Sequence, residues 1–319
     1  MAIEPVQAGG EVLYPSLEPY RHGLLEVGGG HQIYFEECGN PKGFPVVFVH
    51  GGPGSQSRPV HRRFFDPEFY RIVLFDQRGC GQSRPKGLLA ENTTAHLIAD
   101  VEFLRIHLKI DRWLLFGGSW GSTLTLAYTI AHPAHVAGMV LRGVFLGSRP
   151  EVDWFLYGVR YFVPEAWSEF ARDSNGSLLE HYQRRVHDPR PEHAMAAAKS
   201  WSDYETRVME PASILASSSP ASLSDNLEAV RVQLHFLLND LFLRHDELRA
   251  NLWRIQNTPV TIVQGRMDMV CPPITAIAVA HAISGSDLRL VATGGHSAVQ
   301  RDMAAELCAA TRNMKTLLR

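Results

Sequence analysis

A series of short apolar runs, each closely followed by a glycine or a polar residue, constrains the fold of this chain more than any other feature. None of the runs alternates between apolar and polar residues, which indicates strands that are buried on both faces, as in a parallel sheet. The runs are Val46–Val49, Ile72–Phe75, Trp113–Phe116, Met139–Leu141, Val260–Val263 and Leu288–Val291.

Helical patterns lie between several of these runs, for example from Asn92 to His107 and from Thr123 to Ala131. Alternation of strands and helices predicts an α/β fold, with a mostly parallel central sheet and helices on both of its faces. Residues 23–37 come before the first run. They are predicted to form a hairpin around the turn Gly28-Gly29-Gly30.

The alternation stops in the middle of the chain and returns at Val260. The intervening stretch has helical patterning and few strand signals, so residues 148–257 are predicted to form an inserted helical cap. Residues 1–147 and 258–319 would then form the core domain. The alternative is the helical half of an α+β protein, but the returning strand pattern favours an insertion. Within the cap, residues 217–220 are predicted to be a loop.

Composition narrows the classes of function. The formal net charge of −2 argues against a sequence-independent nucleic-acid binder, which would need a basic stripe. The chain starts without the features of a signal peptide, and no stretch approaches the roughly 20 apolar residues that span a membrane. The four cysteines are scattered, without metal-type or redox-type pairing. We therefore expect a reduced, cytoplasmic protein with no metal, no nucleic acid and no membrane partner.

One glycine-rich turn carries a candidate nucleophile. Gly117-Gly118-Ser119-Trp120-Gly121 fits the pattern G-x-S-x-G and lies between an apolar run and a helical pattern, which is the context that this motif needs. Small flanking residues permit the sharp turn, and the N-terminus of the next helix favours negative charge beside the serine. We predict that Ser119 is a catalytic nucleophile.

A serine hydroxyl needs a base, and the base needs a carboxylate to orient it. Asp268 follows the run that ends at Val263, and His296 follows the run that ends at Val291. Both would stand at the C-terminal ends of parallel strands, where α/β sheets place their sites. Among the 15 histidines, only His296 combines a glycine lead-in with a strand end. Ser119, Asp268 and His296 are therefore predicted to form a catalytic triad.

The tetrahedral intermediate of such a reaction needs an oxyanion hole. One donor is expected to be the backbone N–H of Trp120, the residue after the nucleophile. The second is expected from the glycine turn that follows Val49, with Gly52 as the candidate, because glycines let the backbone turn its N–H groups inward without side-chain clashes.

With these motifs on the page, the chain resembles the prolyl aminopeptidases, or proline iminopeptidases, of the α/β-hydrolase superfamily. The resemblance covers most of the chain and is strongest from about Val46 to Leu146. It implies an α/β-hydrolase fold with a helical cap, no cofactor, and a serine exopeptidase that removes N-terminal proline from a short-peptide or small-molecule substrate. It rests on the segments His50–Gly54, Asp76–Ser83, Gly117–Leu124 and Gly295–Ser297.

The resemblance also implies two cap carboxylates that bind the free amino group of the substrate. Glu205, in the segment Trp201–Glu205, carries one of these roles over. Gln233 stands where the second glutamate is expected. A carboxylate about 4 Å from an ammonium is worth roughly 4 kcal/mol at an effective dielectric near 20, before desolvation. A neutral amide loses most of this attraction and brings N–H donors that an ammonium cannot use. Gln233 therefore suits a less charged substrate group better.

Three function classes stay open at this stage. The first is a serine hydrolase that releases N-terminal proline through an acyl-enzyme. The second is a related hydrolase acting on another small amide or ester, for example in secondary metabolism, which the neutral Gln233 favours. The third is a non-hydrolytic protein on the same scaffold, either a binder, against which the complete predicted triad argues, or a lyase, which the sequence leaves open.

Overall fold

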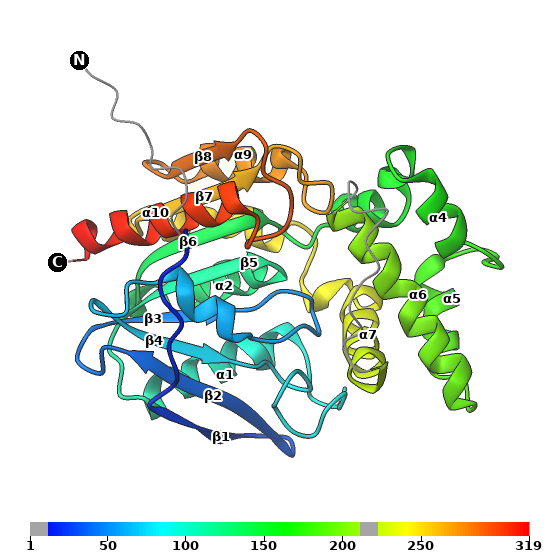
Figure 1. Cartoon of the computed structure of the whole chain (residues 1–319), viewed down its shortest axis with the longest axis horizontal. Coiled ribbons are helices and arrows are strands. Elements are labelled where there is room, and N and C mark those ends of the chain that lie inside the picture. The colour runs from blue at the N-terminus through cyan, green and yellow to red at the C-terminus, as the bar shows by residue number, and fades with distance from the viewer. Residues whose placement is uncertain (1–11, 211–222, 319) are drawn as a thin grey trace.

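The computed structural model describes residues 12–210 and 223–318 (Figure 1). The start of the chain and the loop predicted at residues 217–220 lie outside the described residues. Within the described ranges, no helix is both long enough and apolar enough to cross a membrane.

An eight-stranded sheet forms the centre of the molecule, with the strand order β1-β2-β4-β3-β5-β6-β7-β8. β2 runs antiparallel to both of its neighbours, whereas β3 to β8 are parallel to one another. Each predicted apolar run lies inside a strand, and the predicted hairpin is the pair β1 and β2. The strands are β1 (Arg21–Gly28), β2 (His31–Gly39), β3 (Phe44–Val49), β4 (Tyr70–Phe75), β5 (Trp113–Ser119), β6 (Val136–Val144), β7 (Val260–Gly265) and β8 (Asp287–Val291).

Successive residues of the central strands enter two separate apolar clusters, one on each face of the sheet. In β3, Val47 and Val49 pack with α1 (Thr94–His107), α2 (Trp120–Ala131) and α9 (Pro273–Ala282). Val46 and Phe48 pack on the other face with η1 (Pro59–Phe64) and α10 (Arg301–Leu317). Because both faces are covered, the strands carry the continuous apolar runs seen in the sequence.

The second helix begins earlier than its periodicity indicated. The pattern predicted a start at Thr123, but α2 begins at Trp120. Trp120 and Gly121, the last two residues of the glycine-rich motif, begin its first turn, which is buried on all sides and so carries no amphipathic signal. α1 begins close to its predicted start, with the Thr93 side chain accepting a hydrogen bond from the backbone N–H of His96.

The described residues between β6 and β7 contain helices and no strand. Aromatic rings fill the interior of this segment, with Phe170 stacked between Tyr182 and Tyr204 at centroid distances of 4.7 and 4.0 Å. Its treatment as a separate cap domain stays a prediction. The elements are α3 (Arg149–Asp153), η3 (Trp154–Gly158), η4 (Val159–Tyr161), α4 (Pro164–Phe170), α5 (Leu178–Val186), α6 (Pro191–Met209), α7 (Leu223–Leu238), η6 (Asp240–Phe242), α8 (Glu247–Asn251) and η7 (Leu252–Ile255).

The helical segment lies beyond the carboxyl ends of the parallel strands, where α6 and α7 face the loops that follow β3 and β5 (Figure 1). Two contacts join α7 to these loops. The ring centroids of Phe236 and Trp120 lie 5.2 Å apart in an edge-to-face arrangement. A Cβ on Gly54 would lie 2.3 Å from the carbonyl oxygen of Ala229, so only glycine fits there. A cavity of about 480 Å³ is enclosed between the sheet and these helices.

Candidate active site

Ser119 occupies a sharp turn between β5 and α2. Its backbone is strained, with φ 57° and ψ −129°, a combination that residues other than glycine rarely adopt. The flanking glycines are required by close packing. A Cβ on Gly121 would lie 2.1 Å from the carbonyl oxygen of Val49, and one on Gly117 would lie 2.3 Å from the carbonyl oxygen of Gly121. This packing of α2 against β3 holds Ser119 at the rim of the cavity.

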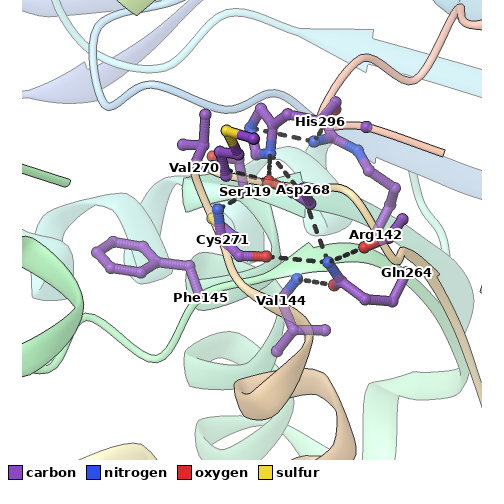
Figure 2. Close-up of polar contacts among 12 residues, drawn as sticks. Ser119, Arg142, Val144, Phe145, Gln264, Asp268, Val270, Cys271 and His296 are labelled. Atoms are coloured by element: carbon purple, nitrogen blue, oxygen red, sulfur yellow. Dashed lines mark hydrogen bonds and ion pairs between the residues drawn. The ribbon is translucent and has the colours of Figure 1, made fainter. Parts of the chain in front are cut away.

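Asp268 and His296 form a buried pair at the ends of β7 and β8 (Figure 2). The Nδ1 atom of His296 lies 2.8 and 3.0 Å from the two carboxylate oxygens of Asp268. The same carboxylate accepts hydrogen bonds from the backbone N–H groups of Val270 and Cys271, at 3.0 and 2.8 Å. A carboxylate can only accept, so Nδ1 of His296 carries the proton and Nε2 is left as an acceptor.

His296 and Ser119 line the same cavity, but no hydrogen bond joins them among the described residues, so the Ser119–Asp268–His296 triad stays a prediction. Instead, Nε2 of His296 faces Nη1 of Arg142 at 3.3 Å, and this Nη1 donates to the His296 carbonyl at 2.8 Å. Catalytic hydrogen bonds are often long or poorly aligned before substrate binds, so the missing Ser119–His296 bond is compatible with proton transfer.

Arg142 is a site residue that the sequence analysis did not single out. It follows the apolar run of β6 directly and so reaches the carboxyl edge of the sheet beside His296. Burial lowers the pKa of its guanidinium, while the nearby Asp268 carboxylate acts in the opposite direction. Its position directly after the apolar run Met139–Leu141 was the only sequence signal that could have pointed to it.

Gln264, at the end of β7, is a second residue that was missed. Its side-chain amide donates to the Cys271 carbonyl at 2.9 Å, and its oxygen accepts from the backbone N–H of Val144 at 3.1 Å (Figure 2). The same amide lies 3.4 Å from a carboxylate oxygen of Asp268. Gln264 therefore ties the loop that carries Asp268 to the neighbouring strand.

The turn after β3 lies directly against Ser119. A Cβ on Gly51 would lie 3.4 Å from Cβ of Ser119 and 3.1 Å from the carbonyl oxygen of Gly118. Gly52 has φ +119°, which strongly favours glycine, and it lines the cavity beside Ser119. Gly52 thus lines the same cavity as the candidate nucleophile and Trp120 follows that residue in the chain, and their role as oxyanion donors stays a prediction.

Glu205 on α6 and Gln233 on α7 meet on the opposite wall of the cavity. The Gln233 amide donates to the Glu205 carboxylate at 2.5 Å, and its oxygen accepts from the indole N–H of Trp201 at 2.9 Å. The indole fixes which end of the amide faces Glu205. Burial raises the pKa of Glu205 to about 7, although hydrogen bonds from Gln233 and Trp201 act against the rise.

Comparison with known proteins places the chain in a family. A family model described as the alpha/beta hydrolase fold matches residues 45–299. A proline iminopeptidase from Arabidopsis thaliana is 44% identical over 96% of this chain and 83% of its own length. The chain belongs to the proline iminopeptidase family. A probable proline iminopeptidase from Leptolyngbya boryana is 42% identical over 94% of this chain and 95% of its own length. The predicted fold class and the predicted family resemblance are both confirmed.

Solved structures place this member of the iminopeptidase family among α/β hydrolases by shape alone. An esterase, RhEst1, from Rhodococcus sp. superimposes with a TM-score of 0.59 at 18% identity, covering 93% of this chain and 99% of its own. A putative aryl esterase from Burkholderia cenocepacia gives a TM-score of 0.62 at 16% identity, covering 93% and 99%. At such low identity the likeness concerns the fold. The activity has to be argued from the iminopeptidase family and from the cavity.

Proposed function

We propose that this hydrolase of the iminopeptidase family releases N-terminal proline from short peptides through an acyl-enzyme. The observation that carries the proposal is the Asp268–His296 pair, in which His296 lines one cavity together with the strained Ser119 and with Glu205. A nucleophile with its base lies on one wall, and an acceptor for an amine lies on the other.

The proposed reaction begins when Nε2 of His296 accepts the hydroxyl proton of Ser119 while the oxygen attacks the prolyl carbonyl carbon. Asp268 keeps the proton of His296 on Nδ1 and stabilises the imidazolium that forms. The backbone N–H groups of Gly52 and Trp120 bind the oxyanion. The imidazolium then protonates the leaving amine, and water activated by the same histidine hydrolyses the ester on Ser119.

Glu205 is proposed to bind the amino group of the substrate proline. Its carboxylate has one oxygen paired with Gln233, and the carboxylate supplies the negative charge at this wall of the cavity. An ammonium donates hydrogen bonds and cannot accept them, so it would bind to Glu205 and to the Gln233 oxygen rather than to the Gln233 amide.

A substrate panel tests the proposal. Prolyl p-nitroanilide, its N-acetyl derivative and p-nitrophenyl acetate should be turned over in that order of kcat/KM, and a fluorophosphonate probe should label Ser119. Faster cleavage of the N-acetyl derivative than of the free amine would reject an aminopeptidase. Absence of labelling in the folded protein would reject the serine mechanism.

The neutral Gln233 favours a second candidate function, namely hydrolysis of another small amide or ester that carries no full positive charge near Glu205. In that case uncharged acyl esters would be the best members of the same panel. Fluorophosphonate labelling of Ser119 would then still be expected, so the two candidates differ in the substrate and share the mechanism.

Replacing Gln233 with glutamate should raise kcat/KM for prolyl p-nitroanilide about tenfold. The second carboxylate adds Coulomb attraction for the ammonium, from which desolvation of the buried charge subtracts. Gln56→Glu is a matched control because Gln56 also lines the cavity but has no contact with Glu205. An equal gain in both variants, or no gain in either, would mean that Gln233 does not meet the amine.

The raised pKa of Glu205 predicts a pH dependence of substrate binding. Below a pH of about 7 the carboxyl group becomes neutral and loses its attraction for the prolyl ammonium, so KM should rise as the pH falls from 8 to 6. Above that range Glu205 is ionised and KM should be flat until the substrate amine itself loses its proton. Glu205→Gln should abolish this limb of the KM profile, and an uncharged ester substrate should not display it.

We further propose that the protein works in a reducing, cytoplasmic compartment. The four cysteines are all free and buried, which suits a place where disulfides do not form. Recovery of the activity in the soluble cytoplasmic fraction of the source cells would support this, and recovery outside the cell would contradict it.

A further inference from the structure

A buried hydrogen-bond network lies behind the candidate oxyanion hole, centred on Gln77 in the loop after β4. The backbone N–H of Gln77 donates to Nε2 of His50 at 2.9 Å, and its side-chain amide donates to the His50 carbonyl at 2.8 Å. Its side-chain oxygen accepts from the indole N–H of Trp120 at 2.9 Å. His50 and Gln77 are each 1% exposed and Trp120 is fully buried, so water cannot replace these bonds.

The network fixes the tautomer of His50. A backbone N–H can only donate, so Nε2 of His50 is an acceptor and its proton is on Nδ1. Nδ1 lies 2.9 Å from the carbonyl oxygen of Gly51 and donates to it. Burial lowers the pKa of His50, which keeps the ring in this neutral form.

Holding the Gly51 carbonyl also orients one of the proposed oxyanion donors. The carbonyl of Gly51 and the N–H of Gly52 belong to the same peptide unit, and in a trans peptide they point in opposite directions. His50 therefore holds one side of this plane so that the Gly52 N–H points to the other side. The glycines on both sides give the plane little resistance to rotation without such an anchor.

The other proposed donor is held by the same glutamine. Trp120 follows Ser119 directly, and its ring fills the space between Gln77 and Phe236 of α7. Rotation of the indole would disturb the backbone of Trp120 at the first turn of α2. The side-chain amide of Gln77 thus contacts both His50, which holds the Gly51–Gly52 peptide after β3, and Trp120, the first residue of α2 after β5.

We propose that Gln77 is a positioning residue that sets the relative orientation of the two oxyanion donors, Gly52 and Trp120. This inference rests on the proposed serine mechanism. Gln77 is not among the residues that line the cavity, so it would act on the reaction only through His50 and Trp120.

The inference predicts a specific kinetic signature. Donors that are aimed in advance at the developing oxyanion stabilise the transition state and contribute little to the ground state. Loss of a whole oxyanion donor costs about 10²- to 10³-fold in kcat, and misaimed donors should cost less. Loosening them should therefore lower kcat while leaving KM nearly constant.

The test compares Gln77→Met with wild type. This variant keeps the volume but removes the side-chain donor and acceptor, and we expect kcat for prolyl p-nitroanilide to fall about 10- to 100-fold with KM within about twofold. A prolyl boronic acid, which mimics the tetrahedral state, should lose affinity by a similar factor. The product proline, whose planar carboxylate does not reproduce the tetrahedral geometry, should lose much less affinity.

Two further variants separate positioning from general damage. Gln77→Glu keeps an acceptor for the Trp120 indole and, when protonated, a donor for the His50 carbonyl, so its kcat should lie between those of Gln77→Met and wild type. Gln82→Met makes the same change at an exposed glutamine of the same loop and should match wild type. If Gln77→Met does not fold, Trp120→Phe removes the indole donor together with part of the buried ring and should show the same split between kcat and KM.

Unchanged kcat in folded Gln77→Met, or a loss carried by KM, would overturn the inference. So would equal weakening of proline and of the boronic acid. The proposed function fails separately, if Ser119→Ala stays active. An inactive Ser119→Ala variant beside a fully active Gln77→Met variant would remove the inference alone.

Discussion

Replacing Ser119 with alanine should lower kcat for prolyl p-nitroanilide by at least about 10⁴-fold, with KM changed little. The change removes the only atom that forms the covalent bond in the proposed mechanism. The loss should stop short of the uncatalysed rate, because the oxyanion donors and the substrate cavity remain. Active-site titration with a fluorophosphonate, followed by steady-state kinetics on both proteins, measures the effect.

Folding should not suffer from this substitution, since Ser119 takes part in the fold through its backbone. Its φ of 57° disfavours any residue with a Cβ, serine and alanine alike, so thermal unfolding should occur within a few degrees of wild type. Ser174→Ala, at a half-buried serine of the helical segment that does not line the cavity, is the matched control and should keep full activity. An active Ser119→Ala variant would refute the acyl-enzyme.

Replacing Asp268 with asparagine should also lower kcat by about 10⁴-fold. Asp268 accepts from Nδ1 of His296 and from two backbone N–H groups. An asparagine in this place keeps one oxygen for the backbone donors and turns its NH₂ group toward Nδ1. Nδ1 would then become the acceptor and the proton would move to Nε2, which could no longer accept the proton of Ser119.

The control for this prediction is Asp287→Asn, at the exposed start of β8, which should leave kcat within about twofold of wild type. Structures of both variants should show the position of residue 268 unchanged. The loss of kcat would then be due to the changed tautomer of His296. A kcat within tenfold of wild type in Asp268→Asn would mean that another group orients His296.

The strands and the family were predictable because their signals are local. Each apolar run, such as Ile72–Phe75, reports burial on both faces in a few consecutive residues, and the structure places it inside a strand. The residue types at strand ends were enough to predict that Asp268 and His296 would meet, because parallel strands bring their carboxyl ends to one edge. Their hydrogen bond confirms that geometry.

Residues that act through contacts distant in sequence were not predictable. Arg142 meets His296 across 154 positions of the chain, and Gln264 reaches Val144 across 120. A single arginine or glutamine after a strand has no spacing that distinguishes it from a surface residue. Gln233 was identified only by comparison with a family pattern, and its pairing with Glu205 depends on how two helices pack.

The long helical segment between β6 and β7 has a consequence for how the substrate preference of this protein can evolve. The strands are hydrogen-bonded neighbours, yet Val144 and Val260 are separated by one contiguous stretch that carries Glu205 and Gln233. Ser119 lies before that stretch, and Asp268 and His296 lie after it. The residues proposed to bind the substrate amine are thus encoded in one continuous segment, apart from the segments that encode the proposed triad. Exchange of this segment between relatives should transfer the substrate preference and leave the hydrolysis reaction intact.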